Sequence, residues 1–234
     1  MAVPGRLVTL VRRGDRPLCV MLPGAGGGMN SYLRLASHLG STYNVSAVRP
    51  AGLLPDETPE DSVTAMAESA LGALGERTPA LVFGWSLGGT IAWEMGVRLA
   101  DRGLRPDLVI VDSSPLRRPS VEADDERIWD IIVAGLGPRA DEQTVRRVER
   151  TFRAQVTALA GYAVERRYPG RVLLLMCPDT GTDGISGRDV ALRRWREVAP
   201  DLRTSTLDTD HYSVFEPEHL DRLIGEIDTF MGEA

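Results

Sequence analysis

Short apolar runs alternate along this chain with longer stretches of helical period, and this alternation constrains the fold more than any other feature. Several runs are continuously apolar, which is typical of strands covered on both faces in a parallel sheet. The helix-length stretches between them imply right-handed β–α–β units. The pattern predicts an α/β fold with a mostly parallel sheet flanked by helices. Strands are expected at residues 6–11, 17–22, 44–48, 80–84, 107–112, 171–176 and 202–207, and helices at about 29–39, 60–75, 87–102, 188–199 and 217–231.

Residues 116–168 interrupt this rhythm. Two helix-length segments follow one another there without a strand between them. An insertion of about 50 residues at the carboxyl edge of a parallel sheet lies where ligands bind, so we expect a helical lid. The apolar residues of the lid could line a tunnel or pack on the core, and their helical spacing favours packing for most of them. They are Ile128, Trp129, Ile131, Ile132, Phe152, Leu159 and Tyr162.

The composition is that of a soluble globular protein, with 43% hydrophobic and 26% charged residues. The net charge of −6 argues against a binder of duplex nucleic acid or of a membrane surface. No apolar run approaches the roughly 20 residues of a membrane span, and the N-terminal sequence lacks the features of a signal peptide. No repeat or low-complexity linker divides the chain. We therefore expect one cytoplasmic domain over residues 1–234.

Two further patterns exclude common cofactor and metal sites. Cys19 and Cys177 each lie inside an apolar run, which predicts core residues rather than a disulfide or a metal pair, with a nucleophilic Cys177 as the alternative. The glycine-rich segment 23–28 follows an expected strand, but Met29 stands where a dinucleotide-binding motif needs its last glycine. A phosphate-binding Gly-Lys-Ser/Thr sequence is also missing. We expect no cofactor and no metal.

The sequence Gly84-Trp85-Ser86-Leu87-Gly88 matches the G-x-S-x-G pattern of a nucleophile elbow. In such an elbow the serine has a strained backbone between a strand and a helix, and side chains two positions away on either side would collide with neighbouring backbone. The apolar run before this motif and the helical stretch after it supply the required context. We therefore predict that Ser86 is a nucleophile.

A serine hydroxyl needs a base to take its proton, and the chain has three histidines. His38 and His219 lie in helical patterns on the flanks, where a surface or capping role is expected. His211 follows the last expected strand, at the same sheet edge as the serine. By elimination and position, His211 is the predicted base.

The base in turn needs a carboxylate to orient it. Asp112 ends a continuous apolar strand, where a buried acid needs a partner to offset its desolvation. Asp179 and Asp183, in the loop after the next expected strand, are the alternatives, because many hydrolases carry their acid there. We favour Asp112.

The chain order Ser86, Asp112, His211 is that of α/β-hydrolases. An oxyanion hole would then use the backbone N–H of Leu87, which follows the nucleophile, and one in the first glycine-rich loop. Ala25 occupies that place, and the glycines around it allow a close approach of the backbone to the developing charge.

Together these residues resemble the thioesterase domains of non-ribosomal peptide synthetases and modular polyketide synthases, of the α/β-hydrolase superfamily. The resemblance runs over nearly the whole chain and includes "MLPGAGGGMNSYLRLASHL", "VFGWSLGGTIAWEMGVRLADRG", "LVIVDSSP", "LRRWREVAP" and "DHYSVFEPEHLDRLIGEI". It implies the same site: Ser86 as nucleophile, Asp112 as acid, His211 as base, and Ala25 and Leu87 as oxyanion donors.

The resemblance further implies that an acyl or peptidyl chain arrives as a thioester on the phosphopantetheine arm of a carrier protein. Two departures bear on this. Family members usually follow a carrier domain, which this chain lacks, so we expect either an excised terminal domain or a freestanding relative. Freestanding editing thioesterases usually place the acid near Asp183 of this chain. In addition, "TDH" replaces the Gly-x-His that commonly precedes the base, a mild change.

The leading functional hypothesis is release of a carrier-bound acyl, polyketide or peptidyl chain by hydrolysis or macrocyclisation. The alternatives are an editing (type II) thioesterase and a small-molecule carboxylesterase. A non-catalytic hydrolase-fold scaffold would be expected to lack a triad member, and none is missing. Polyketide-type relatives dimerise through additional N-terminal helices, which this chain lacks, so we expect a monomer.

Overall fold

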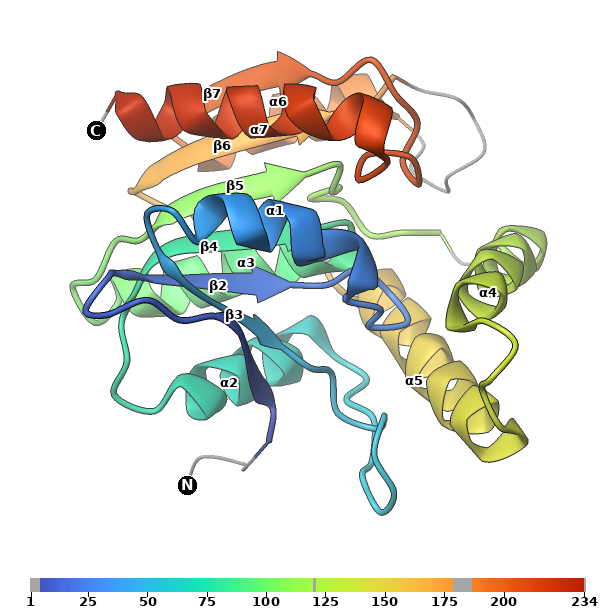
Figure 1. Cartoon of the computed structure of the whole chain (residues 1–234). Coiled ribbons are helices and arrows are strands. Elements are labelled where there is room, and N and C mark those ends of the chain that lie inside the picture. Colours follow the sequence, from blue (N-terminus) through green and yellow to red (C-terminus); the bar gives the residue numbers. More distant parts are fainter. Residues whose placement is uncertain (1–4, 120, 179–186, 234) are drawn as a thin grey trace.

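A seven-stranded sheet forms the centre of the protein (Figure 1). The computed structural model describes residues 5–119, 121–178 and 187–233. The strand order is β1-β3-β2-β4-β5-β6-β7, in which β1 pairs antiparallel with β3 and the other pairs are parallel. The predicted α/β-hydrolase fold is confirmed. The strands are β1 (Leu7–Val11), β2 (Leu18–Leu22), β3 (Asn44–Val48), β4 (Pro79–Trp85), β5 (Asp107–Val111), β6 (Arg171–Met176) and β7 (Asp201–Thr206).

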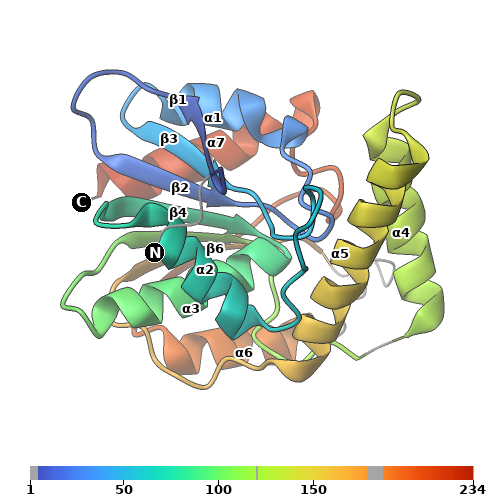
Figure 2. The ribbon, with the colours of Figure 1, turned by 90° about the horizontal axis from the view of Figure 1, so that it is seen from below.

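Helices cover both faces of the sheet. In Figure 2, α1 and α7 lie on one side of the strands, and α2, α3 and α6 lie on the other. The continuous apolar strands serve both layers: along β2, Val20 and Leu22 pack toward α2 and α3, whereas Cys19 and Met21 pack toward α1 and α7. The helices are α1 (Leu33–Leu39), α2 (Val63–Leu74), α3 (Leu87–Ala100), α4 (Glu122–Leu136), α5 (Glu142–Gly161), α6 (Arg188–Val198) and α7 (Pro217–Gly232).

The structure places the predicted elements to within a few residues and changes two of them. The expected helix over 29–39 is a short 3₁₀ turn, η1 (Asn30–Tyr32), followed by α1. The expected strand over 107–112 ends at Val111, because Asp112 has a positive φ of 45° that leaves the extended conformation. The insertion contains α4 and α5, which stand beside the carboxyl ends of the strands (Figure 1).

Both cysteines are buried in the core, as predicted: Cys19 is 0% exposed and Cys177 is 2% exposed. Burial raises the pKa of the Cys19 thiol, so this side chain stays protonated and unreactive at neutral pH. Among the described residues, no helix is both long and apolar enough to cross a membrane.

The loop between β3 and α2 ties α5 to the body of the protein. Glu57 accepts hydrogen bonds from both terminal nitrogens of Arg49 at 2.6 Å and from the backbone N–H groups of Gly52 and Leu54. From α5, Arg150 donates to the carbonyl oxygen of Glu57 at 3.0 Å. The carboxylate therefore holds the loop in the conformation against which α5 docks.

We expect the variant Glu57→Gln to lose stability in a pH-dependent way. The hydrogen bonds from Arg49 lower the pKa of Glu57 to about 2, from an ordinary 4.5. Its stabilisation is therefore complete above about pH 4.5 and is lost as the pH falls through about 2. Urea unfolding should show a deficit of about 2 kcal/mol in the free energy of unfolding at pH 7 and a smaller deficit at pH 3.

The exposed Glu142, which pairs with Arg146 on α5, offers a matched control. Glu142→Gln should change the free energy of unfolding little at either pH. A deficit of the same size at both pH values for Glu57→Gln would contradict the assigned role of this carboxylate.

Candidate active site

The turn between β4 and α3 presents Ser86 in a strained conformation. Ser86 has a φ of 56° and a ψ of −125°, a region that residues other than glycine rarely occupy. A Cβ atom on Gly84 would overlap the backbone carbonyl of Gly88, and a Cβ on Gly88 would overlap the carbonyl oxygen of Leu22 on β2. The glycines of the motif are therefore required by the close approach of α3 to two strands.

Hydrogen bonds from neighbouring residues hold this strained residue in place. The N–H of Ser86 donates to the carbonyl oxygen of Val111 at 2.9 Å, and its own carbonyl accepts from the hydroxyl of Ser113 at 2.5 Å and from the N–H of Gly89 at 3.0 Å. A Cβ on Gly89 would overlap the Ser113 hydroxyl. Gly89, the second glycine after Ser86, thus makes room for a side chain that fixes the elbow, a contact that could not be predicted from the motif.

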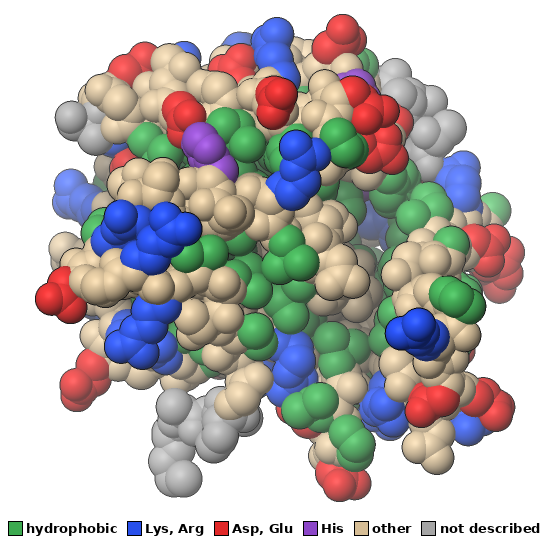
Figure 3. Space-filling model, viewed as in Figure 1, with side chains coloured by type: hydrophobic (Ala, Val, Ile, Leu, Met, Phe, Trp, Pro, Cys, Tyr) green, Lys and Arg blue, Asp and Glu red, His purple; other side chains and the backbone are tan. Residues whose placement is uncertain are grey.

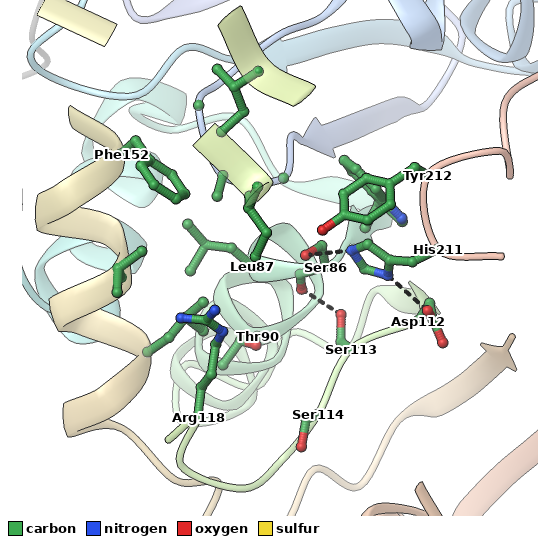
Figure 4. Close-up of a pocket in the computed structure, with 18 of the residues that line it drawn as sticks. Ser86, Leu87, Thr90, Asp112, Ser113, Ser114, Arg118, Phe152, His211 and Tyr212 are labelled. Atoms are coloured by element: carbon green, nitrogen blue, oxygen red, sulfur yellow. Dashed lines mark hydrogen bonds and ion pairs between the residues drawn. The ribbon is translucent and has the colours of Figure 1, made fainter. Parts of the chain in front are cut away.

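The structure brings Ser86, His211 and Asp112 together (Figure 4). The His211 Nε2 atom lies 3.1 Å from the Ser86 Oγ, and its Nδ1 atom lies 2.7 Å from the Asp112 Oδ2. His38 lies instead on α1, 2.8 Å from a carboxylate oxygen on α7, and His219 lies on α7. Neither of these two lines the cavity described below.

Asp112 is fully buried, and its carboxylate is surrounded by donors. Its Oδ1 accepts from the backbone N–H of Cys177 at 2.9 Å, and Arg188, the first residue of α6, pairs with both carboxylate oxygens. Burial acts to raise the pKa of the Asp112 carboxyl, but the hydrogen bonds and charges of His211 and Arg188 hold that pKa below its ordinary value. The carboxylate is therefore ionised at neutral pH.

Arg188 is a functional neighbour that the sequence analysis missed, because nothing in the spacing connects the start of α6 with the end of β5. Asp179 and Asp183, the alternative acids, lie outside the described residues. The described part of the chain places Asp112 at the imidazole.

Aromatic rings fix the imidazole of His211. The indole of Trp85 stacks on it with ring centres 4.8 Å apart, and the ring of Tyr212 meets it edge-on at 4.9 Å. A Cβ on Gly24 would overlap the indole. In Figure 4 the Tyr212 hydroxyl points toward Ser86. The first glycine-rich loop therefore packs, through Trp85, against the same histidine that contacts Ser86.

Ala25 and Leu87, the predicted oxyanion donors, both line the cavity with Ser86. Leu87 is the first residue of α3, where backbone N–H groups have no partner within the helix and the helix dipole favours negative charge. The N–H of the neighbouring Gly26 donates at 2.8 Å to Oε1 of Gln155, a side chain of α5 that is 2% exposed. Gln155, which the sequence analysis did not single out, therefore fixes the loop that carries Ala25.

A cavity of about 540 Å³ opens beside Ser86, between the carboxyl edge of the sheet and the two inserted helices. Figure 3 shows the hollow that separates α4, at the right, from the body of the molecule. Of the seven apolar residues named above, only Leu159 and Tyr162 pack against the core cluster of the described residues, so the expectation that most of them do so is wrong. Five of the seven line this cavity: Ile128, Ile131, Ile132, Phe152 and Leu159. Their spacing places the apolar residues of α4 and of α5 on one face of each helix, and these faces border the cavity.

The other two apolar residues of the insertion support its helices. The indole of Trp129 stacks on Phe152 with ring centres 5.9 Å apart, and the hydroxyl of Tyr162 donates to Glu94 of α3 at 2.9 Å. Within the described ranges, no group of three or more histidine, cysteine, aspartate or glutamate side chains could hold a metal ion.

Comparison with known proteins assigns this chain to a family. The family model for the thioesterase domain matches residues 16–231. A non-reducing polyketide synthase of Pseudevernia furfuracea is 28% identical over 201 residues, which cover 77% of this chain and 9% of the synthase. The chain spans about a tenth of the length of the curated relatives that it matches.

Solved structures show the same fold. The thioesterase domain of NocB, solved as a covalent complex with a fluorophosphonate nocardicin G analog, is 24% identical, with a TM-score of 0.77 over 96% of this chain and 99% of that chain. BorB, a type II thioesterase from the borrelidin biosynthetic cluster, is 22% identical, with a TM-score of 0.76 over 96% of this chain and 95% of that chain. Because the family model covers almost the whole sequence, this protein belongs to the thioesterase domain family.

Proposed function

We propose that this protein releases an acyl, polyketide or peptidyl chain from the phosphopantetheine thioester of a carrier protein through an ester on Ser86. The observation that carries this proposal is the chain of hydrogen bonds from Ser86 through His211 to Asp112, with Ser86 in the wall of a mostly apolar cavity of about 540 Å³. Matches to thioesterase domains of synthases and to a type II thioesterase support a carrier-bound thioester as the substrate.

In the proposed first half-reaction, the Ser86 oxygen attacks the thioester carbonyl while Nε2 of His211 takes the hydroxyl proton. Asp112, ionised and bonded to Nδ1, stabilises the resulting imidazolium. The negative charge on the former carbonyl oxygen is stabilised by the N–H groups of Leu87 and Ala25. When the C–S bond breaks, His211 returns its proton to the leaving thiolate, which leaves an ester on Ser86.

In the second half-reaction, water, or a hydroxyl or amine of the bound chain itself, attacks the ester carbonyl. His211 takes the proton of this nucleophile and passes it to Ser86 as the ester bond breaks. Water yields the free acid, and an internal nucleophile yields a ring. The identity of the product is therefore decided by what the cavity admits to the ester during this step.

The proposal extends to the surroundings of the reaction. The phosphopantetheine arm belongs to the carrier protein, so the protein needs no cofactor or metal of its own. We propose that it acts as a monomer in the cytoplasm, where carrier-bound chains are assembled. Neither nucleic acid nor a membrane takes part in this chemistry.

Intact-protein mass spectrometry with acyl-pantetheine thioesters tests the proposal. Each thioester should carry a distal amine or hydroxyl, and chain length should vary. We expect a covalent adduct on the wild-type protein and none on Ser86→Ala. Ser114 lines the same cavity and gives a matched control, since Ser114→Ala should acylate normally. No adduct and no turnover with any thioester, together with turnover of simple esters, would favour a carboxylesterase and overturn the proposal.

The released product then separates the subclasses. A product lighter than the free acid by one water identifies a cyclase. The linear acid, released fastest from short simple chains, identifies a hydrolase of the editing type. Both outcomes are consistent with an ester on Ser86.

We expect Asp112→Asn to lower kcat by about 10³- to 10⁴-fold, because the amide cannot hold the required imidazole tautomer or stabilise the imidazolium. Asp228, which contacts His38 at the surface, provides the control: Asp228→Asn should leave kcat unchanged. Steady-state kinetics on one thioester measures both. If Asp183→Asn shows the large loss and Asp112→Asn does not, the acid is misassigned.

We expect Gln155→Leu to lower kcat by about 10-fold with little change in KM, because the loop with Ala25 loses its anchor and the oxyanion forms only during the reaction. Gln143 lies exposed on the same helix, so Gln143→Leu should have no effect on either constant. A rise in KM at constant kcat would show that Gln155 shapes the chain-binding cavity instead.

A further inference from the structure

A charged side chain lies in the otherwise largely apolar wall of the cavity. Arg118 follows β5, on the connection to α4, and its backbone N–H donates to the carbonyl oxygen of Leu159 on α5 at 3.2 Å. Its side chain is 12% exposed and lines the cavity with Leu116, Phe152 and Leu159. Figure 4 shows the guanidinium directed into the space between α5 and Leu87. The group therefore faces the region that a bound chain would occupy.

The charge of Arg118 is balanced from the insertion. Its Nη1 atom lies 2.5 Å from Oδ1 of Asp125, which lies in the first turn of α4 and whose side chain is 7% exposed. The pair has no net charge. Nη1 is paired with that carboxylate, whereas Nη2, which is also buried, has no hydrogen-bond partner among the described residues. Donor hydrogens are therefore left over at the cavity wall after the charge has been neutralised.

Such a pair is a poor choice for stability alone. Replacing a buried ion pair by apolar residues of similar volume is often neutral or stabilising, and a buried donor without an acceptor is unfavourable. Leucine or methionine would continue the apolar wall of this cavity. The unsatisfied donors therefore indicate a ligand group that completes the hydrogen bonding when a chain is bound.

The balance of charge defines that ligand group. A carboxylate on the chain would meet Asp125 as well as Arg118, and like charges in a site of low dielectric repel strongly. A saturated hydrocarbon would leave the donors unpaired. An uncharged oxygen, a carbonyl or a hydroxyl, accepts from the guanidinium without disturbing the ion pair.

We propose that Arg118, held by Asp125, is a specificity-determining residue that donates a hydrogen bond to a carbonyl or hydroxyl oxygen of the acyl chain, beyond the thioester carbonyl. This inference rests on the proposed function and names the chemistry of the chain that the cavity selects. A site built to bond an oxygen discriminates strongly against the analogue that lacks it.

The test uses pantetheine thioesters of equal chain length, either saturated or bearing one keto or hydroxyl group at successive positions, and one with a terminal carboxylate. We expect the wild-type kcat/KM for the best oxygenated chain to exceed that for the saturated chain by about 10-fold or more. In Arg118→Leu/Asp125→Leu, which leaves no unpaired charge, the preference should disappear through a loss for the oxygenated chain, while the saturated chain is turned over at least as well.

Two further variants separate recognition from a structural role. Arg127 pairs with Asp124 on the same helix, more exposed to solvent, so Arg127→Leu/Asp124→Leu should keep the preference. Asp125→Asn leaves the positive charge of Arg118 unbalanced, so it should raise kcat/KM for the chain with a terminal carboxylate. A structural role alone predicts no such gain.

The outcomes are distinct. The assignment of Arg118 is overturned if the wild type shows no preference for oxygenated chains, or if the preference survives in Arg118→Leu/Asp125→Leu. In either case, turnover of saturated thioesters still upholds the proposed function. A wild-type preference for the carboxylate also overturns it, because the ion pair would then open to bind an anion. If the wild-type protein turns over none of the thioesters, the proposed function and this inference are both overturned.

Discussion

The active site depends on the absence of side chains at three glycines around Ser86. Because Gly84 and Gly88 touch backbone directly, α3 begins closer to β2 and β4 than any other residue would permit. Ser86 adopts a positive φ at this turn, and Ser86 and Leu87 both line the cavity at the sheet edge. Gly89 extends the constraint to β5 by admitting Ser113. The geometry of Ser86 is thus a consequence of backbone packing.

The active site also requires that the buried negative charge of Asp112 be compensated next to this turn. Asp112 has a positive φ, and its backbone N–H donates to the carbonyl oxygen of Leu175 on β6 at 2.7 Å, so the residue leaves its strand while still tied to the neighbouring one. His211, Arg188 and the N–H of Cys177 then compensate the carboxylate. The carboxylate stays ionised although Asp112 is 0% exposed, and its hydrogen bond to Nδ1 keeps the imidazole oriented.

Sequence patterns sufficed where a residue's role follows from local chemistry. The G-x-S-x-G turn located Ser86, and the position after a buried strand located Asp112, because both features follow from backbone sterics and from the cost of desolvation. Arg188, Gln155 and the contact of Arg118 with Asp125 could not be predicted in this way. Each joins elements far apart in the chain, and their residue types are equally common on solvated helix faces. The same limit explains the wrong expectation for the apolar residues of the insertion. The helical period identifies the apolar face of a helix, but it does not show whether that face packs on the core or lines a cavity.

The two inserted helices have different relations to this machinery. α5 is joined to the first glycine-rich loop through Gln155 and to the β3–α2 loop through Arg150, so its position is set by the same body that holds Ser86. α4 packs on α5 through Trp129 and reaches the β5 connection through Asp125 and Arg118. Changes in α4 can therefore alter the cavity wall while Ser86, His211, Asp112 and the first glycine-rich loop stay in place. α5 also lines the cavity, through Phe152 and Leu159, so both inserted helices contribute to the wall beside Ser86.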